Sequence, residues 1–169
     1  MADRLARLFL SGRLRPCDPA IEAERAILRT FHRFFRIADT AQSERFAECF
    51  TPDALIEYRI MPGPPVLFHG RDSFTAHMSR VPKSQRSLVA HVIGQTTIEW
   101  TADRPLLTAY ATVWHWFSST AAADVGRPAD WVVIGLVRDE FAQHDGEWLI
   151  SHRDVRHVAG RVAAGHGPA

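Results

Sequence analysis

The spacing of the hydrophobic residues changes about halfway along the chain. Over residues 21–38 they recur every three or four positions with arginines between them, which is typical of an amphipathic helix. Ser43 is placed to cap a second, short helix that runs through Phe50, and Gly70 precedes a third helix over residues 71–80. The first half of the chain is therefore predicted to be mainly helical.

Strand patterns begin between the helices of the first half and make up the second half of the chain. Two short β-like runs, 55–60 and 66–69, flank the turn sequence Pro-Gly-Pro-Pro, and Asp145-Gly146 is a strong signal for a tight hairpin. Four longer β-rich runs cover residues 88–100, 106–118, 131–143 and 147–158. Helices followed by strands with short connections predict an α+β fold, in which N-terminal helices pack on a curved, mainly antiparallel sheet around an internal pocket.

These patterns divide the chain into three parts. Residues 1–19 form an N-terminal arm, residues 20–158 form the domain, and residues 159–169 form a C-terminal tail. The arm is basic and amphipathic, so a transit peptide or a membrane-surface helix is an alternative, but we favour an arm that packs on the body or on a partner subunit.

Length and composition fit one globular domain. The chain has 169 residues, of which 46% are hydrophobic and 23% are charged. No apolar run approaches the ~18–20 residues that span a bilayer, so no membrane segment is expected. Two cysteines, Cys17 and Cys49, cannot make a disulfide framework, and the reducing cytoplasm is the predicted compartment.

The charged residues are nearly balanced, with 20 Lys and Arg against 19 Asp and Glu. Of the basic residues 19 are arginines, which suits either bidentate anion contacts or a coding bias in a GC-rich genome, and we favour the bias. Residues 1–16 carry a local charge of +3, and the remainder of the chain, near −2, shows no basic stripe. Nucleic-acid binding is therefore not expected.

Motifs for common cofactors are missing from the sequence. It contains no His-Glu-x-x-His, no Cys-x-x-Cys, no glycine-rich phosphate loop, no Gly-x-Ser-x-Gly and no dinucleotide fingerprint. We therefore predict neither a metal nor an organic cofactor.

Several short motifs, taken in order, resemble the SnoaL-like group of the NTF2-like superfamily. They are Ala38-Asp39, Phe50-Thr51-Pro52-Asp53-Ala54, Gly70-Arg71-Asp72, the run from Ser87 to Gly94, Arg138-Asp139-Glu140-Phe141 with Asp145-Gly146-Glu147-Trp148, and Ser151-His152-Arg153. The nearest parallels are the branch with scytalone dehydratase and hexachlorocyclohexane dehydrochlorinase. The resemblance implies a cone-shaped NTF2-like fold over residues 20–158.

The resemblance also implies a catalytic pair and one phenol. Asp39 and His91 match the family's catalytic aspartate and histidine, and Tyr58 matches a tyrosine that polarises the substrate. Such a pair is chemically sound, because a carboxylate on one ring nitrogen fixes the tautomer that accepts a proton on the other. Taken without the resemblance, a helix cap is the favoured interpretation of Asp39 and a core histidine that of His91, while Tyr58 is equally readable as a core aromatic.

Four further residues are candidates for substrate binding: Trp114, His115, Phe117 and Val137. In the dehydratase pattern a second histidine falls on Phe117, with His115 two residues away on the same strand face, and a polar side chain of the third long strand falls on Val137. Either parity of this strand is possible, and Trp114 faces the pocket in only one of them. The charged residues Asp139, Arg153, Asp154 and Arg156 are interpreted as solvated strand faces or ion pairs.

The predicted function is cofactor-independent acid–base catalysis of the dehydratase, cyclase or isomerase type on a small apolar cyclic or aromatic substrate. The alternative is a non-catalytic NTF2-like module, either a ligand-binding protein or a structural subunit like the β subunit of ring-hydroxylating dioxygenases. By the same resemblance we expect a homodimer or a homotrimer.

Overall fold

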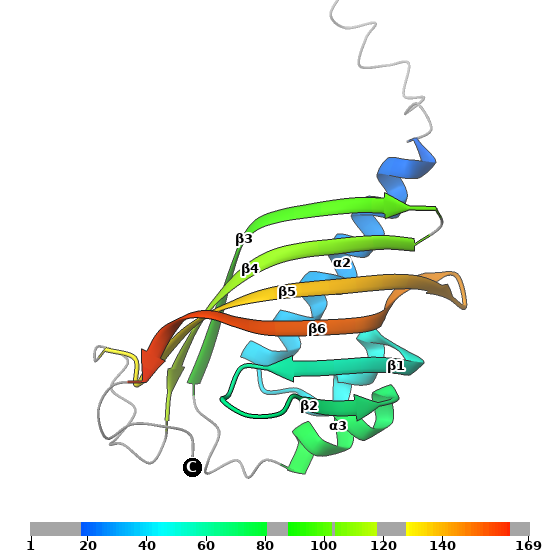
Figure 1. Ribbon diagram of the computed structural model, residues 1–169. Helices are drawn as coiled ribbons and strands as arrows, with labels where there is room; N and C mark the ends of the chain where they lie inside the picture. The colour runs from blue at the N-terminus through cyan, green and yellow to red at the C-terminus, as the bar shows by residue number, and fades with distance from the viewer. Residues whose placement is uncertain (1–17, 81–87, 103, 118–127, 163–169) are drawn as a thin grey trace, which may run out of the picture.

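A computed structural model describes residues 18–80, 88–102, 104–117 and 128–162 of the protein (Figure 1). Three helical segments and six strands follow one another along the chain. The α+β class is confirmed, because the helices all pack on one mixed, unclosed sheet that curves into a cone. Residues 1–17 of the predicted arm and residues 163–169 of the predicted tail lie outside the described residues, while Pro19, predicted as part of the arm, begins a helix.

The long helix α2, Pro19–Asp39, follows the predicted apolar pattern. Asp18 caps its first turn, where the carboxylate accepts a hydrogen bond from the Ala20 amide at 2.9 Å. The buried side chains lie on one face of the helix: Ile27, Thr30, Phe31, Phe34, Phe35 and Ile37. The Thr30 hydroxyl donates to the carbonyl of Trp148 at 2.8 Å and so fastens this face to the last hairpin.

The second helical segment differs from the prediction. It is a 3₁₀ helix, η1, Ser43–Cys49, and Phe50 starts strand β1, Phe50–Arg59, instead of ending the helix. Pro52 has no N–H to donate to a sheet, and the pairing register of β1 shifts between Phe50 and Leu55, so the sequence hides this strand start. Helix α3 covers Arg71–Arg80, as predicted.

The remaining strands are β2, Val66–His69; β3, Leu88–Thr101; β4, Arg104–Trp116; β5, Trp131–His144; and β6, Glu147–Val162. Their order in the sheet is β2-β1-β6-β5-β4-β3, and every neighbouring pair is antiparallel except β1 and β6. β6 ends at Val162, so residues 159–162, predicted as tail, belong to the sheet. The predicted hairpin at Asp145-Gly146 is confirmed, with positive φ at both residues.

The inner face of the sheet, which the helices cover, holds the core (Figure 1). Along β5 the buried residues alternate with less buried ones, as expected for a sheet with one packed face. Aromatic rings fill the space under the helices, and those of Phe34, Phe46 and Phe74 lie within 6.2 Å of one another. The same three rings also line an interior pocket of the cone.

Candidate active site

The interior pocket has a volume of about 650 Å³ and lies between α2, η1 and α3 on one side and the inner face of the sheet on the other. Most of the lining side chains are apolar. The polar exceptions are Ser43, Tyr58, His77, His91, His115 and Arg153. A pocket of this size and composition fits a small, largely apolar molecule that a few polar groups orient.

Asp39 and His91 meet at the wall of this pocket. The distance from His91 Nδ1 to Asp39 Oδ1 is 2.6 Å, and the backbone N–H of His91 also donates to Asp39 Oδ2 at 3.4 Å. His91 lines the pocket and Asp39 lies behind it. Because the carboxylate engages Nδ1, Nε2 is the ring nitrogen left for a bound molecule.

The end of α2 places the aspartate. The amide and the hydroxyl of Thr40 both bond to the carbonyl of Arg36, and Ala41 takes a positive φ of 54°, so the chain turns sharply after Asp39. The carboxylate therefore stands free of the helix and reaches β3, where His91 lies on the inner face.

The surroundings keep the imidazole of His91 neutral at neutral pH. Burial lowers the pKa of His91, the hydrogen bond and charge of Asp39 act against this, and the pKa stays below its ordinary value. A neutral ring with one nitrogen held by a carboxylate is the state that accepts a proton.

Arg153 lines the pocket, and of the two interpretations of this residue the ion pair is confirmed, although it is buried rather than on a solvated strand face. Its side chain is fully buried, and Nε donates to Asp139 Oδ1 at 2.8 Å, with Nη2 bonded to the other carboxylate oxygen. The guanidinium carbon lies 3.6 Å from the centre of the Phe34 ring. Nη1 is also buried and has no hydrogen-bond partner among the described residues.

The charge of Arg153 is firmly maintained. Burial acts to lower the pKa of Arg153, but the charge of Asp139 and its hydrogen bonds raise it above the ordinary arginine value. The pocket therefore contains one permanent positive charge with an N–H group that no described protein atom satisfies. Such a group favours a bound oxygen or anion.

Tyr58 lies on β1 and lines the same pocket. Its ring stacks on Phe74 at 6.0 Å. Burial raises the pKa of Tyr58, although the positive charge of Arg153 acts in the opposite direction. The phenol is therefore protonated at neutral pH and available as a hydrogen-bond donor.

The predicted substrate-binding residues divide between the two faces of the sheet. His115, Phe117 and Val137 line the pocket. The ring of His115 stacks between Trp131, at 4.8 Å, and Phe117, at 6.0 Å, and its burial lowers the pKa of His115 to about 4. Trp114 is not brought to the pocket, because β4 turns its odd-numbered residues inward.

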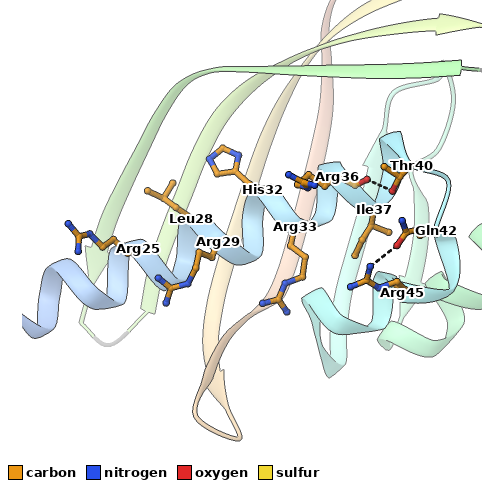
Figure 2. Close-up of a pocket in the computed structure, with 10 residues that line it drawn as sticks. All are labelled: Arg25, Leu28, Arg29, His32, Arg33, Arg36, Ile37, Thr40, Gln42 and Arg45. Atoms are coloured by element: carbon orange, nitrogen blue, oxygen red, sulfur yellow. Dashed lines mark hydrogen bonds between the residues drawn. The ribbon is translucent and has the colours of Figure 1, made fainter.

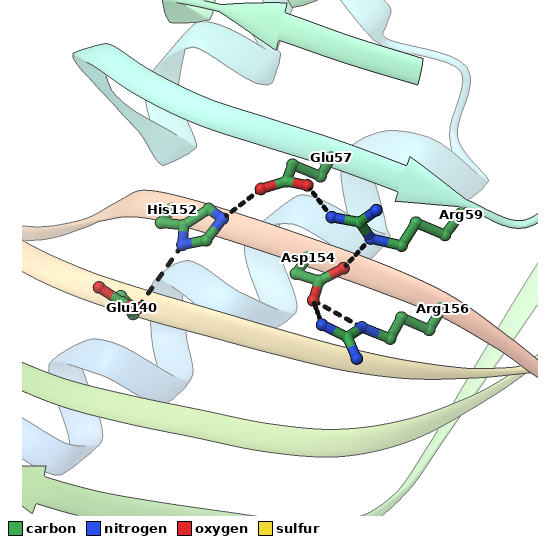
Figure 3. Close-up of polar contacts among 6 residues, drawn as sticks. All are labelled: Glu57, Arg59, Glu140, His152, Asp154 and Arg156. Carbon is green, nitrogen blue, oxygen red and sulfur yellow. Dashed lines mark hydrogen bonds and ion pairs between the residues drawn. The ribbon is translucent and has the colours of Figure 1, made fainter. Parts of the chain in front are cut away.

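The outer face of the sheet carries the other charged residues of the last strands (Figure 3). His152 bridges Glu57, at 3.1 Å, and Glu140, at 3.5 Å. Asp154 pairs with Arg156 and with Arg59, which also contacts Glu57. For Asp154 and Arg156 the interpretation as ion pairs is confirmed.

Asp139 and Arg153 are the site residues that the sequence analysis missed. Counting outward from the two-residue turn pairs Asp139 with His152, but a register shift between Glu140 and Phe141 pairs it with Arg153 instead. The sequence signal that could have placed Arg153 inside is Val155. An apolar residue such as Val155 faces the core, and the residue two positions before it on a strand points to the same face.

Two absences are limited to the described residues. No group of three or more His, Cys, Asp or Glu residues in this part of the chain is arranged to hold a metal ion. None of the described helices is both long enough and apolar enough to cross a membrane.

The comparison with family patterns supports the resemblance seen in the motifs. The SnoaL-like domain matches residues 19–154. The chain belongs to the SnoaL-like domain family. No curated protein matches the sequence.

Solved structures share the fold of this SnoaL-like domain. The Kfla4162 protein from Kribbella flavida has a TM-score of 0.69 and 20% identity, over 84% of this chain and 95% of that one. The LinA-type3 hexachlorocyclohexane dehydrochlorinase from Novosphingobium barchaimii has a TM-score of 0.67 and 15% identity, over 86% of this chain and 93% of that one. ActVI-ORFA from Streptomyces coelicolor has a TM-score of 0.62 and 24% identity, over 79% of this chain and 96% of that one. At these identities the likeness concerns the fold.

Proposed function

We propose that this SnoaL-like domain is a cofactor-independent acid–base enzyme of the lyase or isomerase kind. The proposal rests on the 2.6 Å contact between His91 Nδ1 and Asp39 Oδ1 at the wall of a pocket of about 650 Å³. A dehydrochlorinase among the similar folds supports elimination as one such reaction.

His91 is the proposed base. Its Nε2 takes the proton from a carbon next to a carbonyl group, and the electron pair of the broken C–H bond moves to the carbonyl oxygen as an enolate. Asp39 holds the ring and stabilises the imidazolium that forms. General-base catalysis of this kind contributes about 10²- to 10⁴-fold to a rate.

Tyr58 and Arg153 are the proposed groups that stabilise the enolate oxygen. Both line the pocket, and Tyr58 O–H and Arg153 Nη1 are donors that suit a developing negative charge. The enolate then expels a leaving group, which takes the proton from the imidazolium, or it regains that proton at another carbon. The first outcome is elimination and the second is isomerisation.

The aromatic wall supports a flat substrate. The stacked rings of His115, Trp131 and Phe117 form a flat aromatic surface on one side of the pocket. A cyclic or aromatic molecule packs well on such a surface. We infer a small cyclic carbonyl compound as the substrate class.

Exchange of the α-hydrogens of 2-tetralone in D₂O tests the proton transfer without knowledge of the natural substrate. We expect the protein to accelerate exchange measured by NMR, and Asp39→Asn and His91→Gln each to reduce the enzymatic rate about 10²-fold or more. Asp53→Asn and His69→Gln change exposed residues outside the pocket and serve as matched controls. Equal rates in the control and site variants would refute the proposal.

A ligand-binding module without chemistry is the second candidate. The apolar lining of the pocket favours it. A purely structural subunit is less favoured, because side chains can fill the cone of such a subunit, whereas the cone of this protein holds an open cavity. In that case 2-tetralone binds to the protein, its exchange is not accelerated, and His91→Gln leaves the exchange rate unchanged.

We also propose that the domain forms a homodimer or a homotrimer through the outer face of the sheet. Val92 and Tyr110 lie on this face and are 57% and 42% exposed, which is high for apolar side chains of long strands. Light scattering on the purified chain measures the state directly, and a monomer at about 0.1 mM contradicts it.

A further inference from the structure

A second concave site lies on the opposite side of α2 from the interior pocket. It is a groove of about 710 Å³ along the outward face of the helix and the start of η1 (Figure 2). None of its lining residues also lines the interior pocket. Any ligand of this arginine groove is therefore separate from the substrate of the proposed enzyme.

Five arginines line the arginine groove: Arg25, Arg29, Arg33, Arg36 and Arg45. None of the lining residues in the described part of the chain is acidic. Figure 2 shows Arg29 and Arg33 projecting from the same side of α2, with Arg45 pointing back along the groove toward them. The groove is a concentrated positive surface on a chain whose formal net charge is only +1.

The charges of these arginines are only partly compensated. Arg45 is paired closely with Glu48, while Arg25 reaches Glu22 at 3.3 Å and Arg33 reaches Glu147 at only 3.9 Å. No ion pair is found for Arg29 or Arg36 within the described residues.

A solvated helix face is the simplest explanation for such residues, but the spacing argues against it. Arg25, Arg29 and Arg33 are four residues apart, and like charges at this spacing lower helix stability by about 0.2–0.5 kcal/mol per pair. A solvated face normally alternates acidic and basic residues. A row of like charges is compensated when an anionic partner binds to it.

We propose that the arginine groove binds an acidic helical segment of a partner protein. Residues four apart on a helix are separated by about 6 Å along its axis, so glutamates at the same interval on a partner helix match the arginine row. Half-buried Leu28 offers an apolar contact in the groove. Glu22 and Glu147, beside the groove, repel a uniformly charged phosphate backbone, whereas a helix can place neutral residues opposite them, which favours a protein over a nucleic acid.

A synthetic amphipathic peptide of about 18 residues, with glutamate at every fourth position and leucines beside them, is the probe. Two triple variants of the full chain are compared at low salt by calorimetry. Arg25→Gln/Arg29→Gln/Arg36→Gln removes three of the five groove charges, and Arg80→Gln/Arg104→Gln/Arg138→Gln removes three exposed arginines elsewhere. Both change the formal net charge from +1 to −2.

We expect the groove variant to bind the peptide about tenfold more weakly than the unchanged protein, and the control variant to stay within about twofold. Equal losses in both variants would mean attraction to net charge alone and overturn the proposal. So would tighter binding of an oligothymidylate or of phosphatidylglycerol vesicles than of the peptide. Failure to bind the peptide at about 1 mM also overturns it.

Discussion

Two arginine–carboxylate pairs on opposite sides of α2 have the same geometry and different surroundings. Inside the cone, Arg153 and Asp139 are both 0% exposed, with Nε and Oδ1 2.8 Å apart. At the edge of the arginine groove, Arg45 and Glu48 are 47% and 42% exposed, with Nε and Oε1 2.7 Å apart. The exposure of each pair to water therefore determines how much it contributes to the stability of the fold.

The buried pair is a fixed part of the pocket, whereas the exposed pair is one arrangement among several. Two charges without water depend on each other, and removing one leaves the other uncompensated. Water and salt screen the exposed pair, so each partner is stable alone. The inner pair therefore positions a charge for a ligand, and the outer pair only modulates the charge of a surface.

The largest expected effect comes from breaking the inner pair. Asp139→Leu leaves Arg153 buried without its counter-charge and should lower the free energy of unfolding, measured in urea, by about 3–5 kcal/mol. The matched variant Asp139→Leu/Arg153→Met removes both charges and should recover most of that loss. If the single variant were no less stable than the double variant, the contrast between the two pairs would be wrong.

A smaller loss of stability is expected when His115, on the wall of the interior pocket, is protonated. Burial lowers the pKa of His115 to about 4, below its unfolded value, so the unfolded chain binds more protons between those two pKa values. Stability from this group is therefore complete above the unfolded pKa and declines as the pH falls toward 4. At pH 4.5 the loss is roughly 2–3 kcal/mol.

Urea unfolding of the unchanged protein and of His115→Phe, at pH 7 and pH 4.5, measures this loss. The phenylalanine keeps the stack with Trp131 and cannot be protonated, so its variant should lose less stability on acidification. The same decrease in both proteins would show that His115 does not titrate as its burial requires.

The fold was predictable because its elements depend on local patterns. Hydrophobic spacing located α2 and the long strands, and Asp145-Gly146 located the last hairpin. The start of β1 was not predictable, because Pro52 reads as a strand breaker and lies where the pairing register with β6 shifts between Phe50 and Leu55.

The site was predictable only where the family resemblance supplied it. Asp39 and His91 are 52 residues apart and only the folded chain brings them together. The pairing of Asp139 with Arg153 depends on a one-residue register shift, which exchanges the faces of every later side chain. The arginine groove was not predicted, because the acidic and basic residues are nearly equal in number along the chain, and only the fold gathers five arginines on one face.

The smallest expected effect comes from breaking the outer pair. Glu48→Gln removes the counter-charge of Arg45, but water already solvates both side chains, so the free energy of unfolding in urea should stay within the error of the measurement. The same variant removes one negative charge from beside the arginine groove and should strengthen binding of the acidic peptide. A destabilisation as large as that of Asp139→Leu would mean that geometry rather than burial sets the contribution of these pairs, because geometry is the property the two pairs share.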